Sequence, residues 1–316
     1  MSRKGCASAT AGTTLSLLIC LSTAADAQQP PRTAGPVAPP AIIFGVGDIM
    51  HCAAPEGGDI TGRLMERLLD ETPGSLAITL GDNSNDDGSE LSYDCLNRSS
   101  WGRLMGHVFP TPGNHDYGVD KDLPFYFLYF PNAGPLRRGY YAYNVGAWRV
   151  YALNTELVAP AARLRQLEWL EQDLRANHAS RCVLAYFHRP PFSSGQFASP
   201  AWALPIFRIL YRYGADLAVT AHEHFFAYLP PLNPDGVVDV SKGVPTIIAG
   251  TGGARFFRRP KTLRWGAHGE EIVAGTLGVV RLRLYPGRFD WAFVPAQPMA
   301  GTPPSGAGRC HANPSN

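Results

Sequence analysis

Leu76-Ala77-Ile78-Thr79-Leu80-Gly81-Asp82-Asn83 is an apolar run that stops at a glycine followed by a carboxylate. The run is short enough to be a buried strand. In open α/β sheets, ligands bind in the crevice beyond the carboxyl ends of the strands, where a glycine lets the backbone come close to the ligand. We therefore expect Asp82 to be a ligand, although Gly-Asp after an apolar run is also an ordinary turn.

Four other apolar runs end in residues of the same kind. The run Ile42 to Val46 ends in Gly47-Asp48, and helical spacing over Ile60 to Leu69 predicts a crossover helix between this strand and the next. Strands joined by a crossover helix are parallel, so the two carboxylates share one edge of the sheet, and a right-handed crossover would make the strands neighbours or near neighbours. The remaining runs end at Asn114-His115, at His188, and at His222 with His224.

This mixture of carboxylate, amide and imidazole groups suits Zn, Mn, Fe or Co better than Ca or Mg. The groups are too many for one tetrahedral ion. Two ions about 3.5–4 Å apart, joined by a bridging carboxylate, characterise hydrolases of the two-metal type. A lone histidine after a strand is more often structural than a ligand, but unrelated turns would seldom supply this set in this order, which favours metal binding.

The ends of the chain differ in composition from the middle. Arg3 and Lys4, the apolar stretch from Leu15 to Leu21 and Ala25-Asp26-Ala27 predict a signal peptide over residues 1–27, and hence an exported protein that is periplasmic or extracellular. Residues 28–40 have the composition of a Pro-rich linker. Residues 41–297 are expected to form the domain, and residues 298–316 an extended C-terminal tail.

Charge and cysteines narrow the possible partners and the compartment. The formal net charge of +2 and the lack of a long basic block give no indication of nucleic-acid binding, and no apolar run is long enough to predict a membrane span. The four cysteines of the mature chain allow three disulfide pairings in an oxidising compartment. We favour Cys52 with Cys95, because both follow strand-end motifs closely, which leaves Cys182 with Cys310.

Taken in order, five motifs resemble those of the calcineurin-like metallophosphoesterases: Gly47-Asp48, Gly81-Asp82-Asn83, Gly113-Asn114-His115-Asp116, Phe187-His188 and Ala221-His222-Glu223-His224. The resemblance extends from Ala41 to about Pro295. It is greatest to a secreted bacterial branch related to purple acid phosphatases, which also has Trp-Gly-Arg before the third motif and a late Gly-Thr-Gly-Gly. The fold it implies is α/β, a four-layer αββα sandwich of two mixed β-sheets flanked by helices.

The resemblance also implies roles for these residues. Asp82 would bridge two transition-metal ions (Fe, Zn or Mn), with Asp48 and His224 on one and Asn114, His188 and His222 on the other. His115 would contact the substrate phosphate as general acid or oxyanion stabiliser, and Asp116 would orient its ring. The implied reaction is hydrolysis of a small-molecule phosphate ester by a metal-bound hydroxide.

Phosphomonoesters are the favoured substrates, and phosphodiesters, including cyclic nucleotides, are the alternative. An exported, non-catalytic binding protein with a decayed metal site is the alternative from another class. It would bind at most one metal ion tightly and turn nothing over.

Asn85 and Arg189 stand at positions where this chain departs from the family pattern. Purple acid phosphatases have an iron-binding tyrosine three residues after the bridging aspartate, where this chain has Asn85. We expect His51 to take its place on the first ion, with Asn85 or a water molecule as the alternative. Arg189 replaces a second histidine after His188 and could bind phosphate bidentately, or could be a surface charge before a Pro-Pro turn. Residues 256–259 are a candidate loop over the site.

Overall fold

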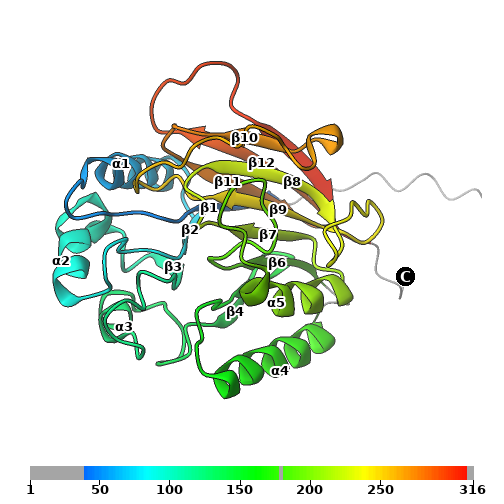
Figure 1. The fold of residues 1–316 in the computed structure, drawn as a ribbon, viewed down its shortest axis with the longest axis horizontal. Coiled ribbons are helices and arrows are strands. Elements are labelled where there is room, and N and C mark those ends of the chain that lie inside the picture. Colours follow the sequence, from blue (N-terminus) through cyan, green and yellow to red (C-terminus); the bar gives the residue numbers. More distant parts are fainter. Residues whose placement is uncertain (1–38, 178–180, 312–316) are drawn as a thin grey trace, which may run out of the picture. The chain divides into compact units, whose positions relative to one another are not determined.

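The computed structural model describes residues 39–177 and 181–311 (Figure 1). The predicted signal peptide and most of the predicted linker lie outside the described residues. Within the described part of the chain, no helix is both long and apolar enough to cross a membrane.

The first sheet has the strand order β13-β12-β11-β1-β2-β3. Its strands are β1 (Ala41–Val46), β2 (Leu76–Leu80), β3 (Val108–Thr111), β11 (Gly278–Tyr285), β12 (Arg288–Pro295) and β13 (Ser305–Arg309). Strands β1, β2 and β3 are parallel, and helix α1 (Glu56–Glu71) forms the crossover predicted between the first two. The hairpin β11–β12 adds to β1 in antiparallel orientation.

The second sheet has the order β10-β8-β9-β7-β6-β5-β4. Its strands are β4 (Tyr141–Val145), β5 (Trp148–Ala152), β6 (Cys182–Tyr186), β7 (Leu217–Thr220), β8 (Phe226–Leu232), β9 (Val244–Ala249) and β10 (Glu271–Val273). Strands β5, β6, β7 and β9 are parallel, whereas β4, β8 and β10 pair in antiparallel orientation. Both sheets are therefore mixed, as the fold prediction requires.

Alternating side chains of the central strands fill three separate cores. On β6, Leu184 and Tyr186 pack between the two sheets with Ile78 and Leu80 of β2. The residues between them on β6 face the other way, towards α4 (Pro160–Asn177) and α5 (Pro200–Arg212). The third core lies between the first sheet and the helices α1, α2 (Glu90–Arg98) and α3 (Pro124–Tyr129). The order helix, sheet, sheet, helix confirms the predicted four-layer sandwich.

Figure 1 shows the same division, with α1, α2 and α3 beside β1, β2 and β3, and with α4 and α5 beside β4 and β6. Two 3₁₀ helices, Ser100–Arg103 (η1) and Gly266–His268 (η3), lie in connecting segments. The elements α2, α3, β8, β10 and β13 were not predicted from the sequence.

The segment after residue 298, expected as an extended tail, contains an edge strand. Strand β13 pairs with β12 in antiparallel register, and its glycines lie on aromatic rings of β12. A β-carbon at Gly306 would lie 2.8 Å from the Trp291 ring, and one at Gly308 would overlap Phe289. Only residues without a side chain fit here, so the Gly-rich composition that predicted a tail in fact permits a strand.

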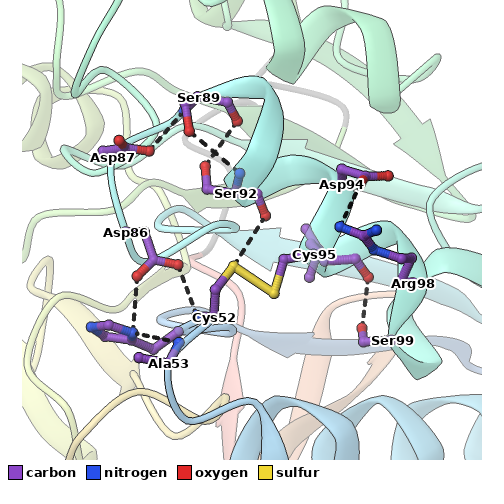
Figure 2. Close-up of a disulfide and its surroundings, with 12 residues drawn as sticks. Cys52, Ala53, Asp86, Asp87, Ser89, Ser92, Asp94, Cys95, Arg98 and Ser99 are labelled. Carbon is purple, nitrogen blue, oxygen red and sulfur yellow. Dashed lines mark hydrogen bonds and ion pairs between the residues drawn. A yellow bond between two sulfur atoms is a disulfide. The ribbon is translucent and has the colours of Figure 1, made fainter.

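Both favoured disulfides form. Cys52, in the loop after β1, is bonded to Cys95 of α2 (Figure 2). Cys182 of β6 is bonded to Cys310, which follows β13, so this disulfide joins the last strand of the first sheet to the second sheet. Disulfides are typical of proteins that fold in oxidising compartments, which is compatible with the predicted export.

Candidate metal centre

The predicted ligands lie in loops at the carboxyl ends of parallel strands from both sheets. Backbone hydrogen bonds hold these loops together: Asp48 N donates to Gly81 O at 3.1 Å, and Ala221 N donates to His188 O at 2.9 Å. A third bond, from Gly47 N to Ala249 O at 2.9 Å, crosses from the first sheet to the second. The site therefore forms where the ends of the two sheets meet.

Three of the predicted ligands have a strained backbone. Asp48, Asp82 and His222 have φ angles of 58°, 48° and 68°, in the left-handed region that residues with a β-carbon rarely adopt. Such strain persists only where the surrounding structure enforces it, and it concentrates at functional sites. Gly81, with φ of 86°, is required for a second reason, since a β-carbon there would lie 2.7 Å from the His188 ring.

One group of predicted ligand atoms surrounds the Nε2 atom of His188. This atom lies 3.2 Å from Asp82 Oδ2, 3.2 Å from Asn114 Oδ1 and 3.1 Å from His222 Nδ1. The other ring nitrogen, Nδ1, is 2.9 Å from the carbonyl oxygen of Leu80, which can only accept, so Nδ1 carries the ring proton. With its proton on Nδ1, His188 turns the lone pair of Nε2 towards Asp82 Oδ2 and Asn114 Oδ1, an arrangement that a proton or a metal cation stabilises.

A second group contains Asp48 and His224. The Nε2 atom of His224 lies 3.4 Å from Asp48 Oδ1, while its Nδ1 donates to Arg255 O at 2.6 Å. Asp48 Oδ2 accepts from the His222 backbone N–H at 2.8 Å, but the buried Oδ1 has no hydrogen-bond partner in the described structure. A buried, unpartnered carboxylate oxygen is destabilising unless a cation or a water molecule binds it.

The pKa values reflect the same charge distribution. Burial alone would raise the pKa of Asp82, but the adjacent His188 lowers it below the usual range for aspartate. Burial alone would lower the pKa of His188, but the Asp82 charge raises it to about 10. Burial, together with the charges of His188 and Arg189, lowers the pKa of His222 to about 2, so that its ring is neutral. The site thus favours one positive charge next to Asp82 and keeps the His222 ring neutral.

His115 lies beside Asp82 with its ring partly exposed. Its backbone N–H donates to Asp82 Oδ1 at 2.8 Å, and Nδ1 is 2.6 Å from the carbonyl oxygen of Asp86. The ring Nε2 is 4.0 Å from Asp82 Oδ2, and the side chain is 40% exposed. The carbonyl of Asp86 therefore orients this ring, and the expectation that Asp116 does so is wrong.

Asp116 instead holds together the two loops that carry Asp82 and Asn114. Its carboxylate accepts from the Tyr93 hydroxyl at 2.5 Å, from Gly113 N at 2.8 Å and from Asn83 Nδ2 at 3.0 Å. Two further backbone N–H groups, of Asn83 and Ser84, lie at 3.3 Å. Because all these donors are already in place, the carboxylate has no free position for a ring. Burial, with the charge of Asp82, raises the pKa of Asp116 to about 6.

His51 is not brought to the other predicted ligands. Its Nδ1 lies 2.9 Å from Asp86 Oδ1, and its side chain is 46% exposed. Asp86 also accepts from Cys52 N at 2.8 Å, beside the disulfide in Figure 2. Asn85, the alternative, is buried; its backbone N–H donates to Met50 O at 2.6 Å, and its Oδ1 has no partner among the described residues.

Arg189 is not a free surface charge. Its Nε lies 2.8 Å from Glu156 Oε1 and 2.9 Å from Oε2, and its Nη1 is 3.0 Å from His222 Nε2. The Arg189 side chain is 18% exposed and that of Glu156 only 5%. Glu156 thus holds a guanidinium group against a predicted ligand, a role for which the sequence contained no signal.

Comparisons with known proteins show the family and the fold of this chain. The family model for calcineurin-like phosphoesterases matches residues 43–226, more than half of the chain. Acid phosphatase type 7 of Danio rerio is 27% identical over 197 residues, which cover 49% of this chain and 44% of the relative, so the match spans less than half of that protein.

Two solved structures show the same fold. A purple acid phosphatase from yellow lupin (Lupinus luteus) seeds superposes with a TM-score of 0.64 at 16% identity, covering 84% of this chain and 53% of the lupin chain. A dimetal phosphatase from Danio rerio superposes with a TM-score of 0.59 at 12% identity, covering 87% of this chain and 100% of that one. With the family model matching residues 43–226, which include the strand ends that carry the predicted ligands, this chain belongs to the calcineurin-like phosphoesterase family.

Proposed function

We propose that this protein hydrolyses phosphate esters, with monoesters as the favoured substrates, at a centre of two transition-metal ions. The observation that carries the proposal is the convergence of side-chain oxygen and nitrogen atoms from Asp82, Asn114, His188 and His222, next to a second pair formed by Asp48 and His224. Membership of a phosphoesterase family supports it.

The residues fit two ions in the chemistry of their donor atoms. Carbonyl acceptors hold the protons of His188 and His224 on Nδ1, which leaves each Nε2 free to bind a metal. Imidazole, carboxylate and amide donors together suit Fe, Zn or Mn. Such ions, when bound, would lower the pKa of water towards about 7 and offset the charge of a phosphate.

The protein's own groups would bind and orient the ester. His115 is partly exposed, and with its Nδ1 proton donated to Asp86 O its Nε2 is the atom that would exchange a proton with the leaving-group oxygen. Arg189 would contact a phosphate oxygen through the guanidinium edge that now lies against His222. Glu156 would then act as a positioning residue, because it fixes the guanidinium group from the opposite side.

We further propose that Asn85, rather than His51, is the remaining ligand of the metal ion that Asp48 and His224 would bind. Asn85 is buried with an unpartnered oxygen, whereas His51 is half exposed and already engaged by Asp86. The variant Asn85→Ala should lose part of the bound metal, and His51→Ala should keep it. Asn85→Tyr, loaded with ferric iron, should gain a visible absorption band from a phenolate on iron. Equal metal loss in the two alanine variants would contradict this assignment.

The decisive experiment measures metal content and turnover of the purified protein together. Two ions per chain by mass spectrometry, with turnover of 4-nitrophenyl phosphate exceeding that of bis(4-nitrophenyl) phosphate, is the expected result. His222→Ala should lose metal and turnover together, while the control His268→Ala, which changes an exposed histidine, should retain both. At most one ion and no turnover after reconstitution with Zn, Mn and Fe would instead support a non-catalytic binding protein.

A further inference from the structure

Two phenylalanine rings from separate loops lie against the predicted metal-binding histidines. The ring of Phe257 stacks flat on His224, with centroids 3.9 Å apart and an interplanar angle of 9°. The ring of Phe197 meets His222 edge-on at 5.9 Å and Phe257 at 4.7 Å. We call the pair Phe197 and Phe257 the aromatic wall. The loop of residues 256–259 does lie beside the site, as the sequence predicted.

Backbone hydrogen bonds fix the aromatic wall to the segment that carries both histidines. Phe197 N donates to the carboxylate of Glu223 at 2.8 Å, and Phe257 N donates to His224 O at 3.4 Å. Glu223 lies between His222 and His224 in the sequence and is 1% exposed. The rings are therefore held in place before any ligand arrives, which reduces the entropy lost on binding.

The aromatic wall also presents apolar surface to solvent beside a polar site. Phe197 is 40% exposed, although its neighbours His222 and Phe257 are partly covered. A single exposed apolar residue is ordinary on a protein surface. Here, however, the exposed ring is part of a fixed pair and lies next to the groups that would bind the phosphate, so the organic part of an ester would pass beside it.

The segment that supplies Phe257 is strongly basic. Residues 255–264 contain five arginine or lysine residues and no acidic residue. Arg255, Arg258 and Arg259 are exposed. No ion pair joins these three to a carboxylate within residues 39–177 and 181–311. Aromatic rings beside unpaired cations favour a ligand that is both planar and anionic.

We propose that the aromatic wall binds the base of a nucleotide, so that the substrates of this site are nucleoside phosphates. This inference rests on the proposed function, because it places the ester phosphate beside His115 and Arg189 and the base on Phe197. The basic segment would then contact any further phosphate groups. The chemical step is unchanged: water cleaves the ester to inorganic phosphate and a nucleoside.

The test compares two esters of equal charge, adenosine 5′-monophosphate and glycerol 3-phosphate. Stacking of a base on an aromatic side chain predicts a loss of roughly 5- to 100-fold in kcat/KM for the nucleotide in Phe197→Ala, with little change for glycerol phosphate. Phe197→Tyr should retain the preference because it keeps the ring. The control Leu128→Ala removes an exposed apolar residue of α3 and should change neither substrate.

The outcomes separate this inference from the proposed function. Turnover of both esters with equal kcat/KM, or an equal loss for both in Phe197→Ala at unchanged metal content, would overturn the inference and leave the phosphoesterase function intact. Absence of turnover with every ester would overturn the function. In that case, calorimetric titration with adenosine 5′-monophosphate tests the inference. It is supported if the wild type binds the nucleotide and Phe197→Ala binds it more weakly. It is refuted if the wild type does not bind the nucleotide.

Discussion

The substitution Asp116→Asn should destabilise the protein although it changes few atoms. The Asp116 carboxylate accepts from the Tyr93 hydroxyl, from Gly113 N and from the side chain of Asn83, and the backbone N–H groups of Asn83 and Ser84 also face it. An amide has only one oxygen, so its NH₂ group must face donors that the second carboxylate oxygen accepted from. Those donors join the loop of Asp82 to the loop of Asn114, and their loss should loosen both.

The size of the stability loss follows from the hydrogen bonds that each of the two carboxylate oxygens accepts. With the amide oxygen towards Gly113 and Asn83, the Tyr93 hydroxyl can rotate to accept from the new NH₂ group, but Ser84 N loses its acceptor. One buried N–H left unsatisfied costs about 1–3 kcal/mol, whereas loss of the charge adds nothing, because burial and the Asp82 charge already disfavour ionised Asp116 and raise its pKa to about 6. We therefore expect a loss of about 1–3 kcal/mol in the free energy of unfolding.

Urea unfolding, followed by circular dichroism in the presence of a chelator and with both disulfides intact, measures this loss without a metal contribution. Asp122→Asn is the matched control, because that carboxylate is 63% exposed and its change should stay within about 0.5 kcal/mol. A loss below about 1 kcal/mol for Asp116→Asn, equal to that of the control, would refute the reasoning. Metal affinity of the folded variant should fall as well.

Three further outcomes are expected. Replacing both Cys182 and Cys310 by Ser should lower the free energy of unfolding by about 5 kcal/mol, because the disulfide closes a loop with a sequence separation of 128. Thermal unfolding measures this loss, and a much smaller loss would contradict the prediction. A hydrogen bond to Asp216 raises the pKa of His311 above its ordinary value of 6.5, against the opposing effect of burial. Its stabilising contribution should be complete below pH 6.5 and disappear at higher pH, so His311→Gln should flatten that part of the stability profile. Gly81→Ala should reduce the metal content of purified protein, because φ of 86° and the adjacent ring leave no place for a methyl group.

The strands that end in predicted ligands could be identified from the sequence because their signals are local. Each is a short apolar run closed by a glycine or a polar residue, and parallel pairing brings such ends to one edge. Strand β8 was missed because Pro230 and Pro231 weaken a strand pattern, and the structure accommodates them at a register shift between Leu229 and Leu232. Strand β13 was missed because its fit depends on contacts between its glycines and the aromatic rings of β12, and the sequence of β13 alone gives no sign of these contacts.

Side-chain partners proved harder to predict than strand ends. The sequence spacing of His51 from Asp48 does not tell in which direction the His51 side chain points, and in the structure its ring lies against Asp86. For Arg189, the deciding partner is Glu156, which is 33 residues away and belongs to a different loop. The ring of His115 is oriented by a backbone carbonyl, a group that every residue has. No pattern of residue types can identify contacts of this kind.

The pairing of β1 with β11 has a consequence for how the chain matures. Strand β1 begins at Ala41, yet one of its two neighbours is completed only at Tyr285, and a further two strands follow before the sheet is finished. Such distant pairings fold slowly, and a nascent chain cannot make them until nearly all of it has left the ribosome. A fragment that stops before β11 would leave an open edge on β1, where other chains can add as strands. Premature termination late in the message should therefore yield aggregated rather than partly active protein.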